Sequence, residues 1–254
     1  SSSSLLFRII GLFDEDTSSD GTNSSGTKKL LKVIDTNNYG GTSGKYWNSA
    51  RTNNWSTASL KTELNGTYLN NLLSASNVNS KLSSGIANTK WHLGGASDSN
   101  YSTLTAEGVY AKERNTSAIY SGNPSSIYAK VGLMYPSDYV YATVGGTTTN
   151  KSSCRDQVLY NWQNSSFSDC KNNDWLFTSQ SSFVHSTEWL LSPYSSTSNH
   201  AASLYSSGYV SSSYVDGGGG YGQFAVRPTF YLDSSILKIV GTGDGSSSNP
   251  YRIG

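Results

Sequence analysis

The chain has 254 residues, of which only 14% are charged, and its formal net charge is +1. The longest basic run is Lys28-Lys29, too little positive charge to hold a phosphate backbone, so nucleic acid is not expected as a partner. No run of about 18 apolar residues occurs, so the sequence predicts no membrane span. The high content of Ser, Thr, Asn and Gly alone would suggest disorder, but 18 tyrosines and 6 tryptophans predict a folded domain instead.

The amino-terminal part of the chain predicts a β-hairpin. Residues 5–13 are apolar apart from Arg8 and are short enough for a buried strand. Residues 14–27 are rich in turn formers, and residues 29–34 are again largely apolar. We therefore expect two strands joined by a loop over residues 14–27.

Short helices are predicted after the hairpin. Ser56 can cap the first with its hydroxyl, and Asn65-Gly66 is a typical end for it. A second helix is predicted over residues 68–73, where leucines repeat at helical spacing, and a third over residues 103–114. Gly108 weakens the third prediction, because glycine disfavours a helix interior.

The rest of the chain predicts strands and loops. Residues 127–134 are expected to form a strand that runs into a turn at residues 135–139, and residues 150–173 a polar loop bounded by the two cysteines. The remaining strands are predicted at residues 189–191, 201–205, 209–215, 224–232, 236–240 and 250–253. Many short strands, with helices confined to the first half, predict an α+β fold with a twisted antiparallel sheet and long loops.

Cys154 and Cys170 are the only cysteines. One interpretation is two unrelated buried thiols. The other is a disulfide that closes a loop of about 15 residues, which would stabilise the fold by about 3 kcal/mol. The low charge and the single methionine are typical of an exported protein and favour the disulfide.

The stretch between Pro193 and Gly222 is composed almost wholly of Ser, Gly, Tyr, Asn and Ala, a mixture suited to adaptable recognition surfaces. Tyrosine gives broad, stiff contact area, while serine and glycine allow close approach. The alternative is that the tyrosines pack on neighbouring strands. The predicted ligand-binding residues are Tyr194, Asn199, His200, Tyr205, Tyr209, Tyr214, Asp216 and Tyr221.

No catalytic residue set, metal site or cofactor site is predicted. Glu107, Glu113 and Glu188 are scattered acids, for which a solvated or capping role is expected. Arg227 lies between Val226 and Pro228, so its five donors must find backbone carbonyls or an acid, and we expect it to stabilise the fold.

Several short motifs recur together in a group of exported bacterial proteins, some of which begin with a type IV prepilin leader. The motifs are Phe7-Arg8-Ile9-Ile10-Gly11-Leu12-Phe13-Asp14, Trp55-Ser56, Leu64-Asn65-Gly66, Gly132-Leu133-Met134-Tyr135-Pro136-Ser137-Asp138-Tyr139, Trp189-Leu190-Leu191-Ser192-Pro193, Val226-Arg227-Pro228 and Ser248-Asn249-Pro250-Tyr251. The sequence resembles this group, whose terminal half is similar to C-type-lectin-like folds. Relatives of that fold include formylglycine-generating enzymes and the variable proteins of diversity-generating retroelements.

The resemblance implies one C-type-lectin-like domain over residues 1–254, with a small β extension as an option from about residue 236. It also implies an extracellular, cell-surface location. The calcium motifs of sugar-binding C-type lectins, Glu-Pro-Asn or Gln-Pro-Asp with a following Trp-Asn-Asp, are missing. The apolar amino-terminal helix of pilins is missing too, whether removed or never present.

These observations leave three functional hypotheses. The first is a recognition or adhesion module, pilus-associated in one version, that binds a protein or glycan on another surface through the loops between residues 193 and 222. The second is a structural subunit that assembles into a surface filament. The third is an enzyme of the formylglycine-generating type, which would need Cys154 and Cys170 as free, reactive thiols. We expect binding or assembly, not catalysis.

Overall fold

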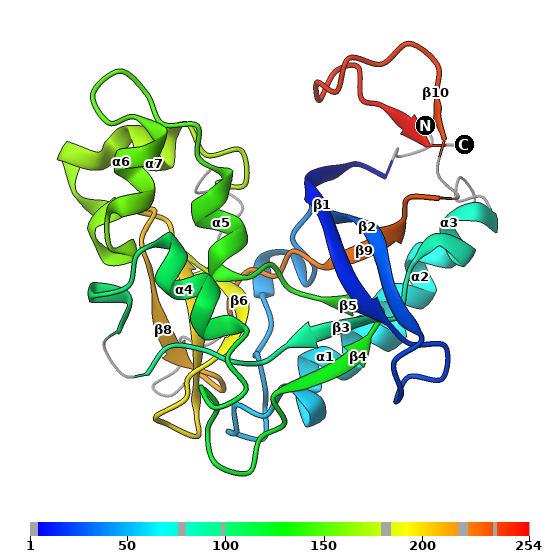
Figure 1. The fold of residues 1–254 in the computed structure, drawn as a ribbon, viewed down its shortest axis with the longest axis horizontal. Helices are drawn as coiled ribbons and strands as arrows, with labels where there is room; N and C mark the ends of the chain where they lie inside the picture. Colours follow the sequence, from blue (N-terminus) through cyan, green and yellow to red (C-terminus); the bar gives the residue numbers. More distant parts are fainter. Residues whose placement is uncertain are drawn as a thin grey trace.

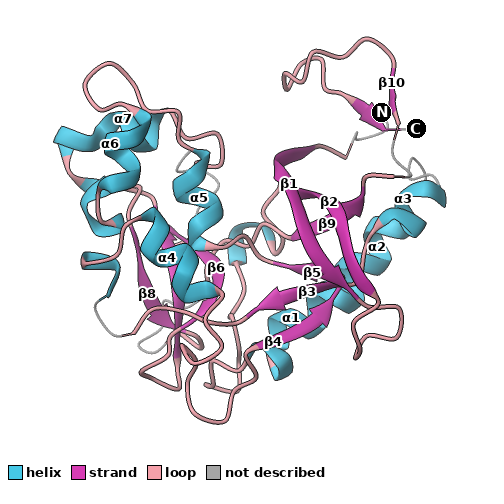
Figure 2. Ribbon diagram, in the orientation of Figure 1, coloured by secondary structure: helices cyan, strands magenta, loops and turns pink. Residues whose placement is uncertain are grey.

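The structure is a computed structural model that describes residues 5–75, 80–97, 100–178, 184–217, 223–235 and 238–253. Two halves lie side by side in Figures 1 and 2, each built on an antiparallel sheet. Among the described residues, all pairings between named strands are antiparallel, and the helices are short. The predicted mixture of helices with antiparallel sheet is therefore confirmed.

The first half is a six-stranded sheet with helices packed beside it (right in Figure 1). Its strand order is β4-β3-β1-β2-β9-β5, so the carboxyl-terminal strand β9 lies between two strands from earlier in the chain. The bounds are β1 Phe7–Thr17, β2 Gly26–Asp35, β3 Thr89–His92, β4 Ser126–Ala129, β5 Val131–Gly132 and β9 Thr229–Asp233. Residues 224–228, predicted as part of a strand over 224–232, contribute only isolated bridges before β9 begins.

The predicted hairpin is present, but its strands are longer than predicted and the connecting loop covers only residues 18–25. Asp14 faces Lys29 and Glu15 faces Lys28 across the two strands. Lys29 and Asp14 form an ion pair at 3.1 Å. Cross-strand pairs of opposite charge stabilise an antiparallel ladder, so charged residues that looked like loop extend the strands.

The first helical segment also continues past its predicted end. Asn54, not Ser56, caps the opening turn by accepting from the Ser56 amide. Helix α1 (Ser59–Glu63) then runs through a π-helical segment, residues Leu64–Tyr68, into α2 (Leu69–Ser74), and α3 covers Ser80–Gly85. The helical segment continues past Asn65-Gly66 because the Asn65 side chain is held elsewhere. It donates to the Val131 carbonyl and accepts from the Lys130 and Val131 amides.

The second half is a three-stranded sheet, order β6-β7-β8, surrounded by helices α4 to α7 (left in Figure 1). The strands are β6 Thr187–Pro193, β7 His200–Tyr205 and β8 Val210–Tyr214. The helices are α4 Ala106–Glu113, α5 Pro136–Ala142, α6 Lys151–Asp156 and α7 Ser168–Asn172. The prediction that helices are confined to the first half of the chain is therefore wrong.

Helix α5 replaces the turn predicted at residues 135–139. Pro136 occupies its first turn, where a missing amide hydrogen costs nothing, and the Asp138 carboxylate accepts from the Tyr135 amide at 2.7 Å. Residues 135–138 therefore have the sequence features of a helix start, although they were predicted to form a turn at the end of a strand.

At the carboxyl end, β10 (Ile239–Val240) and β11 (Arg252–Ile253) form a separate two-stranded sheet. This piece lies where the small β extension was expected. No described helix is both long enough and apolar enough to cross a bilayer.

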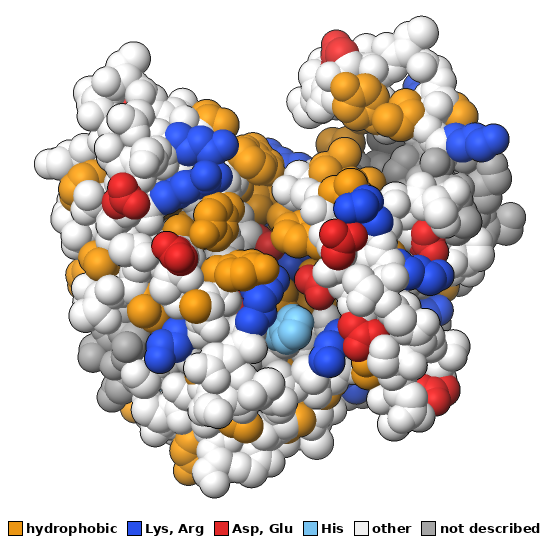
Figure 3. Space-filling view, in the orientation of Figure 1, with side chains coloured by type: hydrophobic (Ala, Val, Ile, Leu, Met, Phe, Trp, Pro, Cys, Tyr) orange, Lys and Arg blue, Asp and Glu red, His pale blue; other side chains and the backbone are white. Residues whose placement is uncertain are grey.

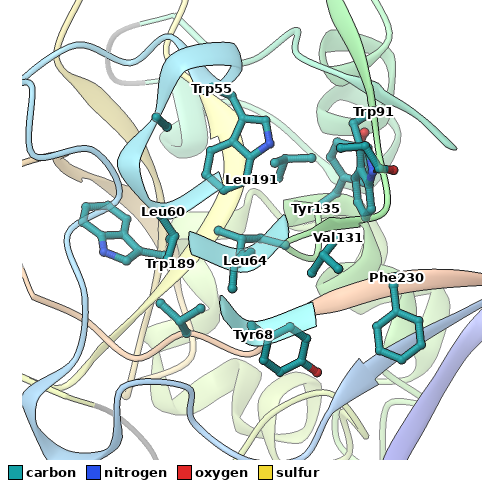
Figure 4. Packing of buried hydrophobic residues seen from close by; sticks show 14 of the residues in the cluster. Trp55, Leu60, Leu64, Tyr68, Trp91, Val131, Tyr135, Trp189, Leu191 and Phe230 are labelled. Carbon is teal, nitrogen blue, oxygen red and sulfur yellow. The ribbon is translucent and has the colours of Figure 1, made fainter. Parts of the chain in front are cut away.

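A core of large aromatic and branched side chains joins the two halves. Figure 4 shows Trp55 near Leu191, with Trp189 on one side of the cluster and Trp91 and Tyr135 on the other; Leu191 and Trp189 come from the three-stranded sheet. Arg227 is buried in this region and forms an ion pair with Glu188 at 2.7 Å. The predicted structural role of Arg227 is confirmed, whereas the solvated role expected for Glu188 is wrong, because its carboxylate is the buried partner.

Candidate functional site

Seven of the eight predicted ligand-binding residues lie in the described part of the chain, and Tyr221 lies outside it. The structure does not gather the seven on one surface. Tyr194 is only 3% exposed, whereas Tyr214 is 48% exposed. Asp216 forms an ion pair with Arg51 at 2.5 Å, so its charge is already compensated within the chain.

One group of rings lies where β7 meets β8. Tyr205 and Tyr209 stack face to face at 4.5 Å, and Tyr160 meets the edge of the pair at 5.1 Å from Tyr209. The Tyr205 and Ser213 hydroxyls are hydrogen-bonded at 3.2 Å. Burial raises the pKa of Tyr209 to about 12, so its hydroxyl stays protonated and available as a donor.

A second group begins at the other end of β7. The rings of Tyr101, Tyr194, His200 and Tyr214 follow one another, with centroids 5.8, 6.1 and 4.1 Å apart. Asn53 fixes this row by donating to the carbonyls of Tyr194 and His200. The His200 ring is also 2.9 Å from the Asn199 amide oxygen. The inner half of the row is core, as the packing alternative predicted.

The two groups lie on opposite faces of the small sheet. His200 pairs directly with Tyr214, and neighbouring residues of a strand point to opposite sides, so Tyr205 lies on the other face from His200. Five residues of strand also separate them along β7, a distance of about 17 Å. One small partner therefore cannot contact all the predicted residues at once.

Cys154 and Cys170 are joined by a disulfide, as predicted. Their surroundings differ from the prediction, because both sulfurs are fully buried and the cysteines belong to helices α6 and α7. Trp162 covers the bridge and donates to the Cys154 carbonyl. Residues 150–173 are mostly polar, so the sequence did not indicate that Cys154, Trp162 and Cys170 point into the core.

A cavity that the sequence did not indicate lies between β1 and helices α4 and α5. Its volume is about 140 Å³, and we call it the central groove. Figure 3 shows the surface hollowed between the two halves, with hydrophobic side chains along the hollow. The groove is lined by Ile10, Phe13, Tyr110, Arg114, Ser137, Asp138, Tyr141, Ala142 and Trp175.

The rim of the central groove is aromatic and exposed. Tyr110, Tyr141 and Trp175 are 41%, 36% and 40% exposed, respectively. The Arg114 guanidinium lies over the Tyr110 ring at 3.7 Å, and Tyr110 meets Tyr141 edge to face at 6.4 Å. Arg8 of β1 donates to the Trp175 carbonyl, which ties the two walls together. Tyr141 also lines a wider adjoining cavity of about 430 Å³.

Ionisable side chains from both halves converge beneath the rim. Lys32 and Asp138 form a buried ion pair at 2.6 Å. Arg114 bonds Glu113 at 3.2 Å, and the Glu15 carboxylate lies 3.9 Å from both Arg114 and His92. These two longer separations exceed hydrogen-bond distance, so Glu15 faces Arg114 and His92 without bonding either.

Burial moves the pKa values of His92 and Glu113 in the direction of their neutral forms. Desolvation, assisted by the charge of Arg114, lowers the pKa of His92 to about 4. Desolvation also raises the pKa of Glu113 to about 7, although Arg114 and Ser137 oppose the shift. Glu113 therefore holds a proton near neutral pH. Its carboxyl group accepts from the Ser137 amide and hydroxyl as a cap of α5, so of the two expected roles, solvated or capping, it has the capping one.

Sequence reasoning missed the central groove because its parts are far apart in the chain. The available signal was Lys32, which lies on the same face of β2 as Leu30 and Ile34 and is completely buried, as they are. A lysine at an inward strand position predicts a buried carboxylate partner. Among the described residues, no group of three or more His, Cys, Asp and Glu side chains is placed to hold a metal ion.

No protein-family model matches the sequence, and neither a curated protein nor a solved structure with detectable similarity was found.

Proposed function

We propose that this protein is an extracellular recognition module that binds a protein or glycan on another surface, with the central groove as its ligand site. The observation that carries the proposal is the set of three exposed aromatic rings around a cavity that Arg114 also lines. Large rings are usually buried, and when exposed around a cleft they are typical of contact surfaces.

The chemistry of the groove suits one ring-shaped or planar group. A cavity of about 150 Å³ holds a benzene-sized molecule, which is close to the volume of the groove. Ring faces at the rim can stack on a sugar or an aromatic side chain, and the Arg114 fork can donate to a hydroxyl or carboxylate. The rigid sheet and helix on either side would hold these groups in place before binding.

Two further features support the location and the fold within this proposal. A disulfide closes part of the chain, and such bonds persist in oxidising, extracellular surroundings. Antiparallel sheets with long connections and short helices fit a C-type-lectin-like domain over residues 1–254.

The other hypotheses are less well supported. The formylglycine-type enzyme needs free thiols, and the disulfide leaves neither Cys154 nor Cys170 free. A surface-filament subunit predicts self-association, which electron microscopy of native cell surfaces would reveal. The stacked pair Tyr205–Tyr209 is a second candidate contact surface within the recognition hypothesis.

Paired variants test the site. We expect Tyr110→Ala/Trp175→Ala to weaken binding to a glycan array or to whole cells at least tenfold, because truncated aromatic anchors cost about 2 kcal/mol or more. Tyr205→Ala/Tyr209→Ala tests the second surface in the same assay. Tyr46→Ala/Tyr251→Ala is the matched control, since both rings are exposed and lie outside the groove lining.

Each result points to one surface. Loss of binding in the groove variant alone, with an unchanged Tm, supports the proposal. Loss in the Tyr205/Tyr209 variant alone would move the ligand site to the small sheet. Wild-type binding by both variants, or no binding by the wild-type protein to any glycan or cell, would reject recognition through either surface.

A further inference from the structure

Lys32 and Asp138 meet in surroundings that are unusual for an ion pair. Their charged atoms are 2.6 Å apart, and their side chains are only 1% and 4% exposed. Lys32 comes from the middle of β2, and Asp138 from the first turn of α5 in the other half. A buried ion pair loses hydration that its mutual attraction seldom repays in full, so its persistence calls for a further reason.

Aromatic rings enclose the Lys32 amine. The rings of Tyr135, Tyr231, Trp91 and Phe13 have centroids 4.3, 5.1, 5.4 and 5.6 Å from the Nζ atom. Figure 4 shows Trp91 and Tyr135 side by side in this part of the core. The rings keep water away, and this desolvation lowers the pKa of Lys32, which increases the fraction of uncharged amine. Only the uncharged amine is a nucleophile.

A second carboxyl group lies in the same buried region. Glu15 of β1 is buried and interacts electrostatically with both Lys32 and Asp138. Desolvation raises the pKa of Glu15, although the charges of Lys32 and Arg114 oppose the shift. Glu15 is therefore a further ionisable group in the surroundings of the pair.

We propose that Lys32 and Asp138 react to form an intramolecular amide bond. Within the ion pair, a proton passes from the Lys32 ammonium to the Asp138 carboxylate, and the uncharged Nζ then attacks the Cγ of the resulting carboxyl group. A proton moves from the nitrogen to one of the hydroxyl oxygens, the Cγ–O bond breaks, and one water molecule leaves. An ammonium and a carboxylate thus become an amide and water, with no oxidation or reduction.

The geometry favours this condensation. Well-oriented groups held in contact reach effective concentrations on the order of 10⁵–10⁸ M, which offsets the cost of amide formation in water. Asp138 also lines the central groove, so the released water has a way out. The bond would link β2 covalently to α5, and therefore the two halves to each other, beneath the groove. This inference does not depend on what the groove binds.

Intact mass spectrometry of the reduced, unfolded wild-type protein tests the proposal. We expect a mass lower than that of the sequence by one water, and a branched peptide on proteolysis that joins Lys32 to Asp138. Lys45 is the internal control, because it also contacts a carboxylate, Glu63, and a tyrosine ring, but in a solvated setting. No branched peptide should join those two. A wild-type protein with the full sequence mass would overturn the proposal.

Variants identify the reacting groups. Asp138→Ala and Lys32→Arg should have the full sequence mass. Asp138→Asn should still form the same cross-linked product, now by losing ammonia, which an ion pair alone would not do.

Discussion

At the scale of single residues, His92 and Glu113 give the protein two opposing responses to pH. The folded-state pKa of His92 is about 4, below its value of about 6.5 in an unfolded chain. Between these values the unfolded state binds the extra proton, so stability rises with pH. The pKa of Glu113 is about 7 in the folded state, above its unfolded value, so in its window the folded state binds the extra proton and stability falls with pH.

Single variants should separate the two responses. Between pH 4.5 and 6.5 we expect the free energy of unfolding of Glu113→Gln to have a more positive slope with pH than that of the wild type, because the opposing Glu113 response is removed and the His92 response remains. The slope of His92→Asn should be less positive than that of the wild type over the same interval, because the Glu113 response remains. Each slope can reach about 1.4 kcal/mol per pH unit, and urea unfolding at stepped pH measures it.

All other titrating groups are shared by the two variants, so their contributions cancel in the comparison. The wild-type slope should lie between the slopes of the variants. Parallel profiles in Glu113→Gln and His92→Asn would show that the two groups titrate normally in the folded protein.

At the scale of elements, the π-helical segment between α1 and α2 depends on one side chain. Asn65 satisfies three backbone groups of the turn between β4 and β5, at 2.8 to 3.0 Å. Leu64 and Tyr68 of the same segment are buried in the main core. The helix is therefore attached to the six-stranded sheet by a side chain that would normally end it.

Removing the Asn65 amide should be costly. We expect Asn65→Ala to lower the free energy of unfolding by about 2–3 kcal/mol, because part-buried backbone groups lose their partners. Asn70→Ala, on the exposed side of α2, is the matched control and should change stability by no more than about 0.5 kcal/mol. Equal effects of the two variants in urea unfolding would show that the contacts of Asn65 contribute little.

At the scale of the whole molecule, the two halves share their packing. Leu30 and Trp91 of the six-stranded sheet belong to the same buried cluster as Trp189 and Leu191 of the three-stranded sheet. The indole of Trp189 donates to the Lys45 carbonyl across the same boundary, at 2.8 Å. Neither half therefore has a complete core without the other.

We expect the protein to unfold in one cooperative transition for this reason. Far-ultraviolet circular dichroism, which follows both sheets, and tryptophan fluorescence, which follows mainly the shared cluster, should give the same urea midpoint. Two separated transitions, or a fluorescence change that precedes the loss of secondary structure, would contradict a shared core.

The sequence by itself determined the features that depend on neighbouring residues. Apolar runs predicted the hairpin, and helix α4 lies inside the predicted range of residues 103–114. Arg227 between apolar neighbours predicted a buried, bonded guanidinium. Two cysteines in a chain of exported character predicted the disulfide. In each case the spacing of apolar residues, or the bonding requirement of one side chain, already limits the local structure that the segment can adopt.

Only the tertiary structure decided which ionisable and aromatic residues share a site. Tyr194 and Tyr214 both lie close to serines in the sequence, yet one ring is buried and the other exposed. Lys32 acquires its character from Asp138, which lies 106 residues away. Burial, and with it the protonation state of a group, is set by contacts between segments that are distant in the chain. The central groove could therefore be recognised only once both halves were in place.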